Sequence, residues 1–142
     1  LTLVLDAAKG AVAVIVAQQW GPLYGCAEWL PLAAAVSAVI GHNYTFVLNF
    51  RGGKGLATTA GAMVVLWPPG IAVLLASIGV GAFALGDTNA GTGVGVWLLP
   101  PVFWLVHRDM SWLLLGAALA LTIASRHVGD FYAYLSGRRQ VT

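Results

Sequence analysis

Apolar runs alternate with short polar or glycine-rich turns along the whole chain. Prolines mark two of the breaks, Gly21-Pro22 and Trp67-Pro68-Pro69-Gly70, because proline lacks the N–H that a helix interior needs. We expect Pro100-Pro101 to kink a later run. The pattern predicts six apolar helices, in the segments 1–20, 30–40, 56–66, 71–86, 94–106 and 110–125.

Composition explains why these helices are so apolar. Of the 142 residues, 59% are hydrophobic and 8% are charged, and the mean hydropathy is +0.85. Soluble domains carry about 25% charged residues. We therefore predict an all-α integral membrane protein with about six transmembrane or half-membrane helices, folded as a single domain over residues 1–142.

The second predicted helix, Leu30–Ile40, is too short for a full crossing. Eleven residues cover about 16 Å at 1.5 Å each, whereas the hydrocarbon core is about 30 Å thick. The helix either extends into its flanks or stops within the membrane, where a polar loop must line a cavity. Glycine-rich and small residues elsewhere are typical of close helix packing in lipid.

Charge predicts the orientation. Counting crossings places six of the seven Lys and Arg residues on one side, with Arg108 alone on the other. That side is cytoplasmic by the positive-inside rule. The same side receives Asp6, His42 and the segment Asp87–Gly93, predicted to be a polar loop that is either a plain turn or close to a ligand. We therefore expect the polar loops of this side to face the cytoplasm.

The turn Arg51-Gly52-Gly53-Lys54-Gly55 concentrates glycines and cations in a chain that is nearly free of charge. Glycine lets a backbone approach a ligand closely, and successive N–H groups in such a turn bind anions. A helix beginning at Leu56 adds its positive end. The physics indicates a phosphate or carboxylate site, or alternatively a polar turn whose cations set topology.

Two motifs carry a family resemblance. Gly41-His42 followed by Phe50-Arg51-Gly52-Gly53-Lys54-Gly55-Leu56-Ala57-Thr58 resembles the second signature of the bacterial acyl-phosphate:glycerol-3-phosphate acyltransferases, the PlsY family, with Thr45 in place of a usual proline. Arg126-His127 through Gly137 resembles the third signature. Asp130 stands there for Asn, Ala133 for Arg and Arg139 for Glu. The family's first motif would precede Leu1, so we expect an N-terminal helix and loop to be missing.

The resemblance implies transfer of a fatty acyl group from acyl-phosphate to the 1-hydroxyl of glycerol 3-phosphate, which gives lysophosphatidate and phosphate. It also implies a location in the bacterial inner membrane, with the active site facing the cytoplasm. Lys54 and His127 are the expected catalytic residues, with Asp130 beside His127. The residues expected to bind substrate or phosphate are His42, Arg51, Gly52, Gly53, Gly55, Thr58, Arg126 and Asp130, and Thr58 is expected to cap the helix that follows the turn.

Other partners and functions are also open at this level. We expect membrane lipid as a partner, no nucleic acid, no cofactor and no metal site, because the histidines lack partners at ligand spacing. Cys26 is alone, which excludes an internal disulfide. Asp6 and Lys9 form either a helix-end pair or support for the site. The alternative functions are a small transporter and a non-catalytic relative that binds a phosphate compound.

Overall fold

The structure is all-helical. A computed structural model describes residues 2–45 and 52–137, and no strand occurs in these ranges. The helices are α1 (Thr2–Trp20), α2 (Leu30–Asn43), α3 (Leu56–Leu66), α4 (Pro69–Leu85), α5 (Thr88–Gly95), α6 (Leu99–His107) and α7 (Met110–Leu135), with short 3-10 helices η1 (Gly21–Tyr24) and η3 (Val96–Leu98).

Within residues 2–45 and 52–137, three segments are long and apolar enough to cross a membrane: Thr2–Tyr24, Thr88–His107 and Met110–Leu135. The helices α2, α3 and α4 are shorter but equally apolar. Large apolar side chains cover the outside, and the Phe83 side chain on α4 is 93% exposed. A greasy exterior of this kind suits lipid as the surrounding solvent. The prediction of an all-helical fold is therefore confirmed, and the apolar helices are consistent with a membrane protein.

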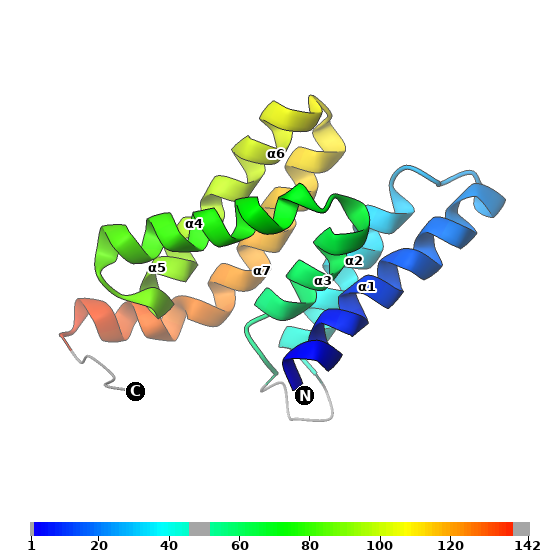
Figure 1. Cartoon of the computed structure of the whole chain (residues 1–142). Coiled ribbons are helices and arrows are strands. Elements are labelled where there is room, and N and C mark those ends of the chain that lie inside the picture. The colour runs from blue at the N-terminus through cyan, green and yellow to red at the C-terminus, as the bar shows by residue number, and fades with distance from the viewer. Residues whose placement is uncertain (1, 46–51, 138–142) are drawn as a thin grey trace.

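The helices form two groups that meet along α2 and α7 (Figure 1). In the first group α1 packs on α2 and α3, and Gly10 and Gly61 let the α1 and α3 backbones touch, since a Cβ at either position would overlap the other helix. In the second group α4 packs on α5, while α5 and α6 pack on α7. Small residues at these contacts are what helix packing in lipid requires.

The segment Asp87–Gly93 is helical, and its prediction as a loop is wrong. Asp87 is the N-cap of α5, and its carboxylate accepts a hydrogen bond from the N–H of Ala90 at 2.8 Å. Such a cap stabilises the first turn of a helix. Gly91 and Gly95 then pack against the α4 backbone. Tertiary packing therefore overrides the low helix propensity of a glycine-rich segment.

Pro100 and Pro101 were predicted to kink a helix, but the helix is interrupted at a different place. The break falls before them, at the 3-10 turn η3, and Pro100 lies in the first turn of α6. Proline is tolerated there because its missing N–H would have no helical partner. The α5–η3–α6 segment thus forms one interrupted helix, which is long and apolar enough to cross a membrane.

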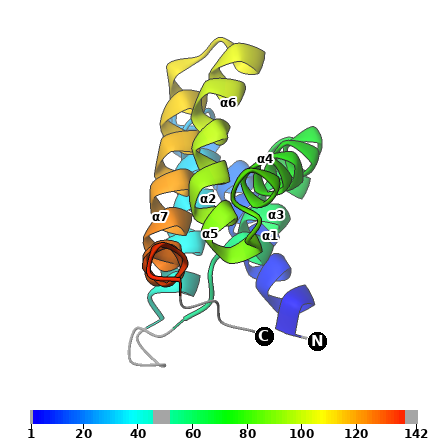
Figure 2. The ribbon, with the colours of Figure 1, turned by 90° about the vertical axis from the view of Figure 1, so that its left-hand side faces the viewer.

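A bend in α7 directs its last part away from the rest of the helix, and Figure 2 views that last part end on while the first part stands upright. At the bend, side-chain donors form hydrogen bonds with a backbone carbonyl of α7. The Thr122 carbonyl accepts hydrogen bonds from Ser125 Oγ at 2.8 Å and from Asn43 Nδ2 at 3.1 Å. Side chains that bond into the backbone ladder of a helix bend it. The helix nevertheless continues through to Leu135, beyond the predicted segment.

The opposite end of the bundle is aromatic. His107 stacks flat on Trp112, with ring centroids 3.5 Å apart, and Trp67 meets both rings edge on. Asp109 caps α7, and two hydrogen bonds from Ser111 hold the pKa of its carboxyl below the usual value. This cluster joins the α3–α4 break to the α6–α7 turn.

Candidate active site

One end of the bundle brings together residues that lie far apart in the sequence. The start of α1, the end of α2, the turn before α3, the start of α5 and the last part of α7 meet there (Figure 1). The grouping of Asp6, His42, Lys54 and Asp130 at one end agrees with the predicted topology. Arg51 lies outside the described residues.

The glycine-rich turn rests on the end of α2. A Cβ at Gly52 would overlap the His42 carbonyl oxygen, and one at Gly53 would overlap the His42 ring. Gly55 has a φ of 80° and is the N-cap of α3. No side chain caps α3, and Thr58 lies inside its first turn, so the prediction that Thr58 caps the helix is wrong. Its hydroxyl is fully buried and lacks a hydrogen-bond partner among the described residues.

Asn43 fixes this arrangement from within, although the sequence analysis did not single it out. Its side chain is fully buried, and Nδ2 donates to the carbonyl of Thr122 on α7. Its Oδ1 has no partner among the described residues and lies beside Gly55. An amide at the end of an apolar helix, within the glycine-rich motif, is the sequence signal that could have identified it.

Arg126 joins α7 to the turn. Its Nη2 donates to the Gly52 carbonyl at 3.0 Å and its Nε to the Gly53 carbonyl at 3.3 Å. The guanidinium also lies over the Tyr44 ring, and the Tyr44 hydroxyl is 2.6 Å from Ser125 Oγ. Because a trans peptide directs its N–H away from its C=O, the N–H groups of Gly53 and Lys54 point away from Arg126.

Lys54 is the cation that the turn presents to the neighbouring helices. Its ammonium donates to Asn89 Oδ1 on α5 and to Asp130 Oδ2 on α7, both at 2.7 Å. The Lys54 side chain is 40% exposed and that of Asp130 is 26% exposed. Asp130 therefore pairs with Lys54, whereas sequence analysis had associated it with His127. Asn89 is a second polar contact that the sequence analysis did not name.

His127 is buried, with 1% of its surface exposed. Its Nδ1 lies 2.9 Å from the carbonyl oxygen of Ile123. A carbonyl can only accept, so Nδ1 carries the proton and Nε2 of the neutral ring keeps its lone pair. Gly93 on α5 leaves room for the ring, since a Cβ there would lie 2.9 Å from His127 Cβ. Lys54, Asp130 and Arg126 are its charged neighbours.

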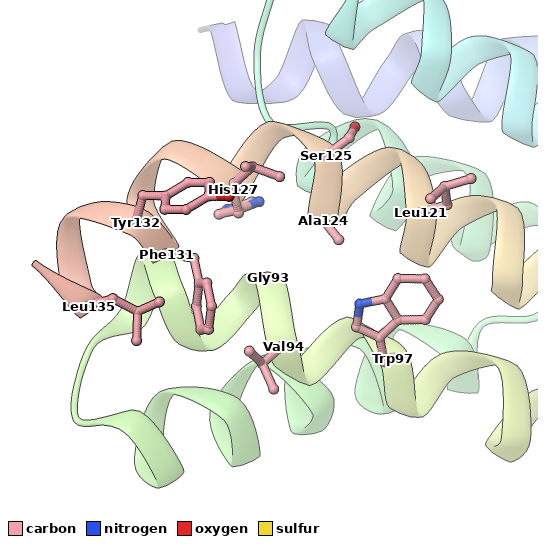
Figure 3. A pocket seen from close by; sticks show the side chains of 11 residues that line it. Gly93, Val94, Trp97, Leu121, Ala124, Ser125, His127, Phe131, Tyr132 and Leu135 are labelled. Carbon is pink, nitrogen blue, oxygen red and sulfur yellow. The ribbon is translucent and has the colours of Figure 1, made fainter.

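An apolar groove of about 590 Å³ runs between α7 and the α5–η3 segment, and His127 is one of the residues that line its α7 side. Figure 3 shows Trp97 reaching from η3 toward Leu121, and Phe131 reaching from α7 toward Val94. Pockets of 300–1,000 Å³ suit small organic ligands. This groove could not be identified from the sequence, because most of its residues are ordinary apolar members of three separate helical elements.

His42 and Asp6 form a supporting contact below the turn. His42 Nδ1 is 3.4 Å from Asp6 Oδ1, and Lys9 Nζ is 3.0 Å from the same oxygen. The His42 ring faces Gly53 on its other side. Among the described residues no group of three or more His, Cys, Asp or Glu side chains is arranged to hold a metal ion.

The arrangement therefore combines two chemical environments. Lys54 and Arg126 supply positive charge at the turn, and the neutral His127 lies beside them with an open nitrogen. His127 also lines an uncharged groove. Such a site suits an anionic molecule with a long apolar part.

Comparison with known proteins gives one consistent result. The sequence profile described as glycerol-3-phosphate acyltransferase matches residues 1–137. A glycerol-3-phosphate acyltransferase of Azotobacter vinelandii is 36% identical over 141 residues, which cover 99% of this chain and 71% of that protein. One from Gluconobacter oxydans is 37% identical over 142 residues, covering 96% of this chain and 66% of that protein.

A third relative, the glycerol-3-phosphate acyltransferase of Pseudomonas syringae pv. tomato, is 32% identical over 140 residues, covering 99% of this chain and 70% of that protein. No solved structure matches the chain. The profile and these relatives extend over nearly every residue described above, including both signature motifs, so this chain belongs to the glycerol-3-phosphate acyltransferase family.

Proposed function

We propose that this chain transfers a fatty acyl group from acyl-phosphate to the 1-hydroxyl of glycerol 3-phosphate, in phospholipid synthesis. A bond forms between the hydroxyl oxygen and the acyl carbon, and the bond from that carbon to the phosphate oxygen breaks. The hydroxyl proton passes to a base, and the products are lysophosphatidate and inorganic phosphate. Family membership supports the reaction class.

The observation that carries the proposal is the position of His127. It is buried between a cationic turn and an apolar groove, where a phosphate-bearing acyl chain would have its carbonyl carbon. The phosphate of the donor would lie toward the turn and the acyl chain would lie in the groove. No covalent enzyme intermediate is needed, because phosphate is already a good leaving group.

The cationic side has groups that could bind the phosphates of both substrates. Lys54 would neutralise phosphate charge and the charge that develops on the acyl oxygen. The N–H groups of Gly53 and Lys54 point away from Arg126 and are available to a second anion. Arg126 holds the carbonyls of Gly52 and Gly53 in place, so its main contribution is to orient the turn. Gly55 and Thr58 would place the positive end of α3 at the same anion.

His127 is suited to accept the hydroxyl proton. The Ile123 carbonyl fixes its tautomer and leaves Nε2 as the accepting atom. The phosphate of glycerol 3-phosphate is the competing base, and His127 would then orient the substrate instead. His42 faces Asp6 and the Gly53 backbone, which favours a role in shaping the turn.

The groove is suited to the acyl chain. Its walls are apolar, and it lies on the side of α7 that faces the α5–η3 segment. Burial of a hydrocarbon chain is worth about 0.8 kcal/mol per methylene. An amphiphilic donor would thus enter from the lipid while glycerol 3-phosphate enters from the water.

We further propose that the polar end faces the cytoplasm of a bacterial inner membrane. Lys9, Lys54 and Arg126 lie at this end, whereas Arg108 lies at the α6–α7 turn at the other end. Positive residues favour the cytoplasmic side. Labelling of single cysteines introduced at Lys9 and Arg108, in a chain whose Cys26 is replaced by Ser, tests this orientation in intact cells and in inverted vesicles.

The test of the reaction is a product assay in lipid vesicles. The chain is supplied with acyl-phosphate and glycerol 3-phosphate, and both lysophosphatidate and released phosphate are measured. We expect equal amounts of the two products, and neither when glycerol replaces glycerol 3-phosphate. Passage of glycerol 3-phosphate across sealed vesicles without lysophosphatidate would instead indicate a transporter.

A further inference from the structure

The ammonium of Lys54 has two acceptors of different charge. Asn89 Oδ1 is neutral and Asp130 Oδ2 is anionic, and each accepts a hydrogen bond of 2.7 Å. An ammonium carries three donors, so one remains for a ligand. The two acceptors come from α5 and α7, which pack directly on each other.

The region beyond these acceptors is too small for a phosphate. A hollow of about 20 Å³ lies there, bounded by Asp87, Asn89, Asp130, Ala133 and Tyr134. Such a volume holds about one water molecule. The two carboxylates on its wall also repel an anion. A phosphate must therefore reach Lys54 from the side of the glycine-rich turn and His127.

A phosphate that binds Lys54 from that side approaches an ammonium that already has a counter-ion, the Asp130 carboxylate. The Asp130 carboxylate is partly buried beside the same ammonium. A phosphate bound to the third donor would lie close to this carboxylate, and like charges at such a distance repel each other. The Asn89 amide carries no charge and accepts from Lys54 with or without a phosphate.

We propose that Asn89 is a positioning residue that holds Lys54 in the site, and that Asp130 is an internal counter-ion that the substrate phosphate must displace or share. This inference rests on the proposed function and adds two residues with separate effects. Asn89 acts on the reaction through the placement of Lys54. Asp130 acts on the affinity for phosphate compounds and leaves the acyl-transfer step nearly unchanged.

The two effects predict different kinetic results. Asp130→Asn keeps an acceptor for Lys54 but removes the competing charge. We expect the KM for glycerol 3-phosphate and the inhibition constant of inorganic phosphate each to fall about fivefold, as for a partly exposed ion pair, with kcat changed less than twofold. Asp109→Asn is the matched control, because it removes a carboxylate at the far end and Asn still caps a helix.

Variants at Asn89 test the positioning role. Asn89→Ala removes a hydrogen bond to a charged group, and we expect kcat, and kcat/KM with it, to fall about tenfold. Asn89→Asp restores an acceptor oxygen and adds a second carboxylate. It should recover kcat to within about twofold while raising the KM for glycerol 3-phosphate at least threefold, a separation that a purely structural role would not produce.

Two results would overturn the inference. One is that the KM for glycerol 3-phosphate and the inhibition constant of phosphate stay unchanged or rise in Asp130→Asn. The other is an unchanged kcat in Asn89→Ala. Calorimetry of inorganic phosphate binding to the same variants in lipid nanodiscs does not depend on the reaction. It therefore distinguishes failure of this inference from failure of the proposed function. If wild-type chain makes no lysophosphatidate, the proposed function fails. Tighter phosphate binding by Asp130→Asn would still support the counter-ion role.

Discussion

The last part of α7 has two sides that differ in almost every physical respect. Arg126 and Asp130, four residues apart, face the glycine-rich turn and bond to its carbonyls and to Lys54. His127 and Phe131, also four residues apart, line the apolar groove. Residues at this spacing lie on one face of a helix. A one-residue offset in a single helix therefore separates a charged environment from a hydrocarbon one.

The difference teaches how a small membrane protein can hold an amphiphile. The polar side uses a few directed hydrogen bonds made by Lys54, Arg126 and Asp130, whereas the groove uses many apolar contacts without direction. The bend in α7 starts just before Arg126. The polar and the apolar side of the helix beyond this bend therefore both lie at the cationic end of the bundle. The predictions below alter one side at a time.

The largest effect is expected at the boundary itself. His127→Asn keeps a donor near the Ile123 carbonyl and removes Nε2, so kcat should fall about 10²- to 10⁴-fold if His127 is the base. Steady-state kinetics with glycerol 3-phosphate measure it. A loss below tenfold, with the protein still folded, would assign the base to the substrate's own phosphate.

Removal of charge on the polar side should come next. Lys54→Ala leaves phosphate and the developing oxyanion without a cation, and kcat/KM should fall about 10²- to 10³-fold. Arg108→Ala removes one cation at the far end and serves as the control. Retained activity in Lys54→Ala would contradict the role of the polar side.

Filling the groove should affect the donor alone. Ala124→Phe places a ring between α7 and the α5–η3 segment, and the KM for acyl-phosphate should rise about tenfold. The KM for glycerol 3-phosphate should stay the same. The matched control is Ala118→Phe on the same helix, which faces a different groove, shared with α2. Equal effects of the two variants would mean that the chain binds elsewhere.

The smallest effect is expected at the end of the groove. Trp97 is half exposed and closes the end near Leu121 (Figure 3). Trp97→Ala should shift the preference toward longer acyl chains, with a change in relative kcat/KM of about two- to fivefold per two methylenes. Trp104→Ala removes an exposed tryptophan from α6 as the control. Unchanged chain preference would remove Trp97 from the groove's function.

Sequence patterns predicted the helices and the meeting of the charged segments well, because apolar runs and proline breaks determine them locally. They also located the glycine-rich turn, whose glycines are required by contact with His42. Patterns did not predict that Asp87 begins a helix, since the stability of α5 comes from glycine contacts with α4.

The pairings between helices depend on geometry that no local pattern contains. Spacing placed Asp130 on the face of His127, yet the bend in α7 and the reach of Lys54 give it a different partner. Asn89 was part of a presumed loop, and Asn43 was one residue within a motif. The groove arises only when α5 and η3 lie against α7, so its residues could be identified only from the structure.

The most direct test of the two-sided site is photo-crosslinking in lipid. A non-hydrolysable acyl-phosphonate with a diazirine near the end of its chain is bound and irradiated, and the labelled residues are mapped by mass spectrometry. We predict labels on Trp97 and Leu121, and their loss when Ala124→Phe fills the groove. Labels confined to α1 or to the α2–α7 groove, unaffected by that substitution, would contradict the account.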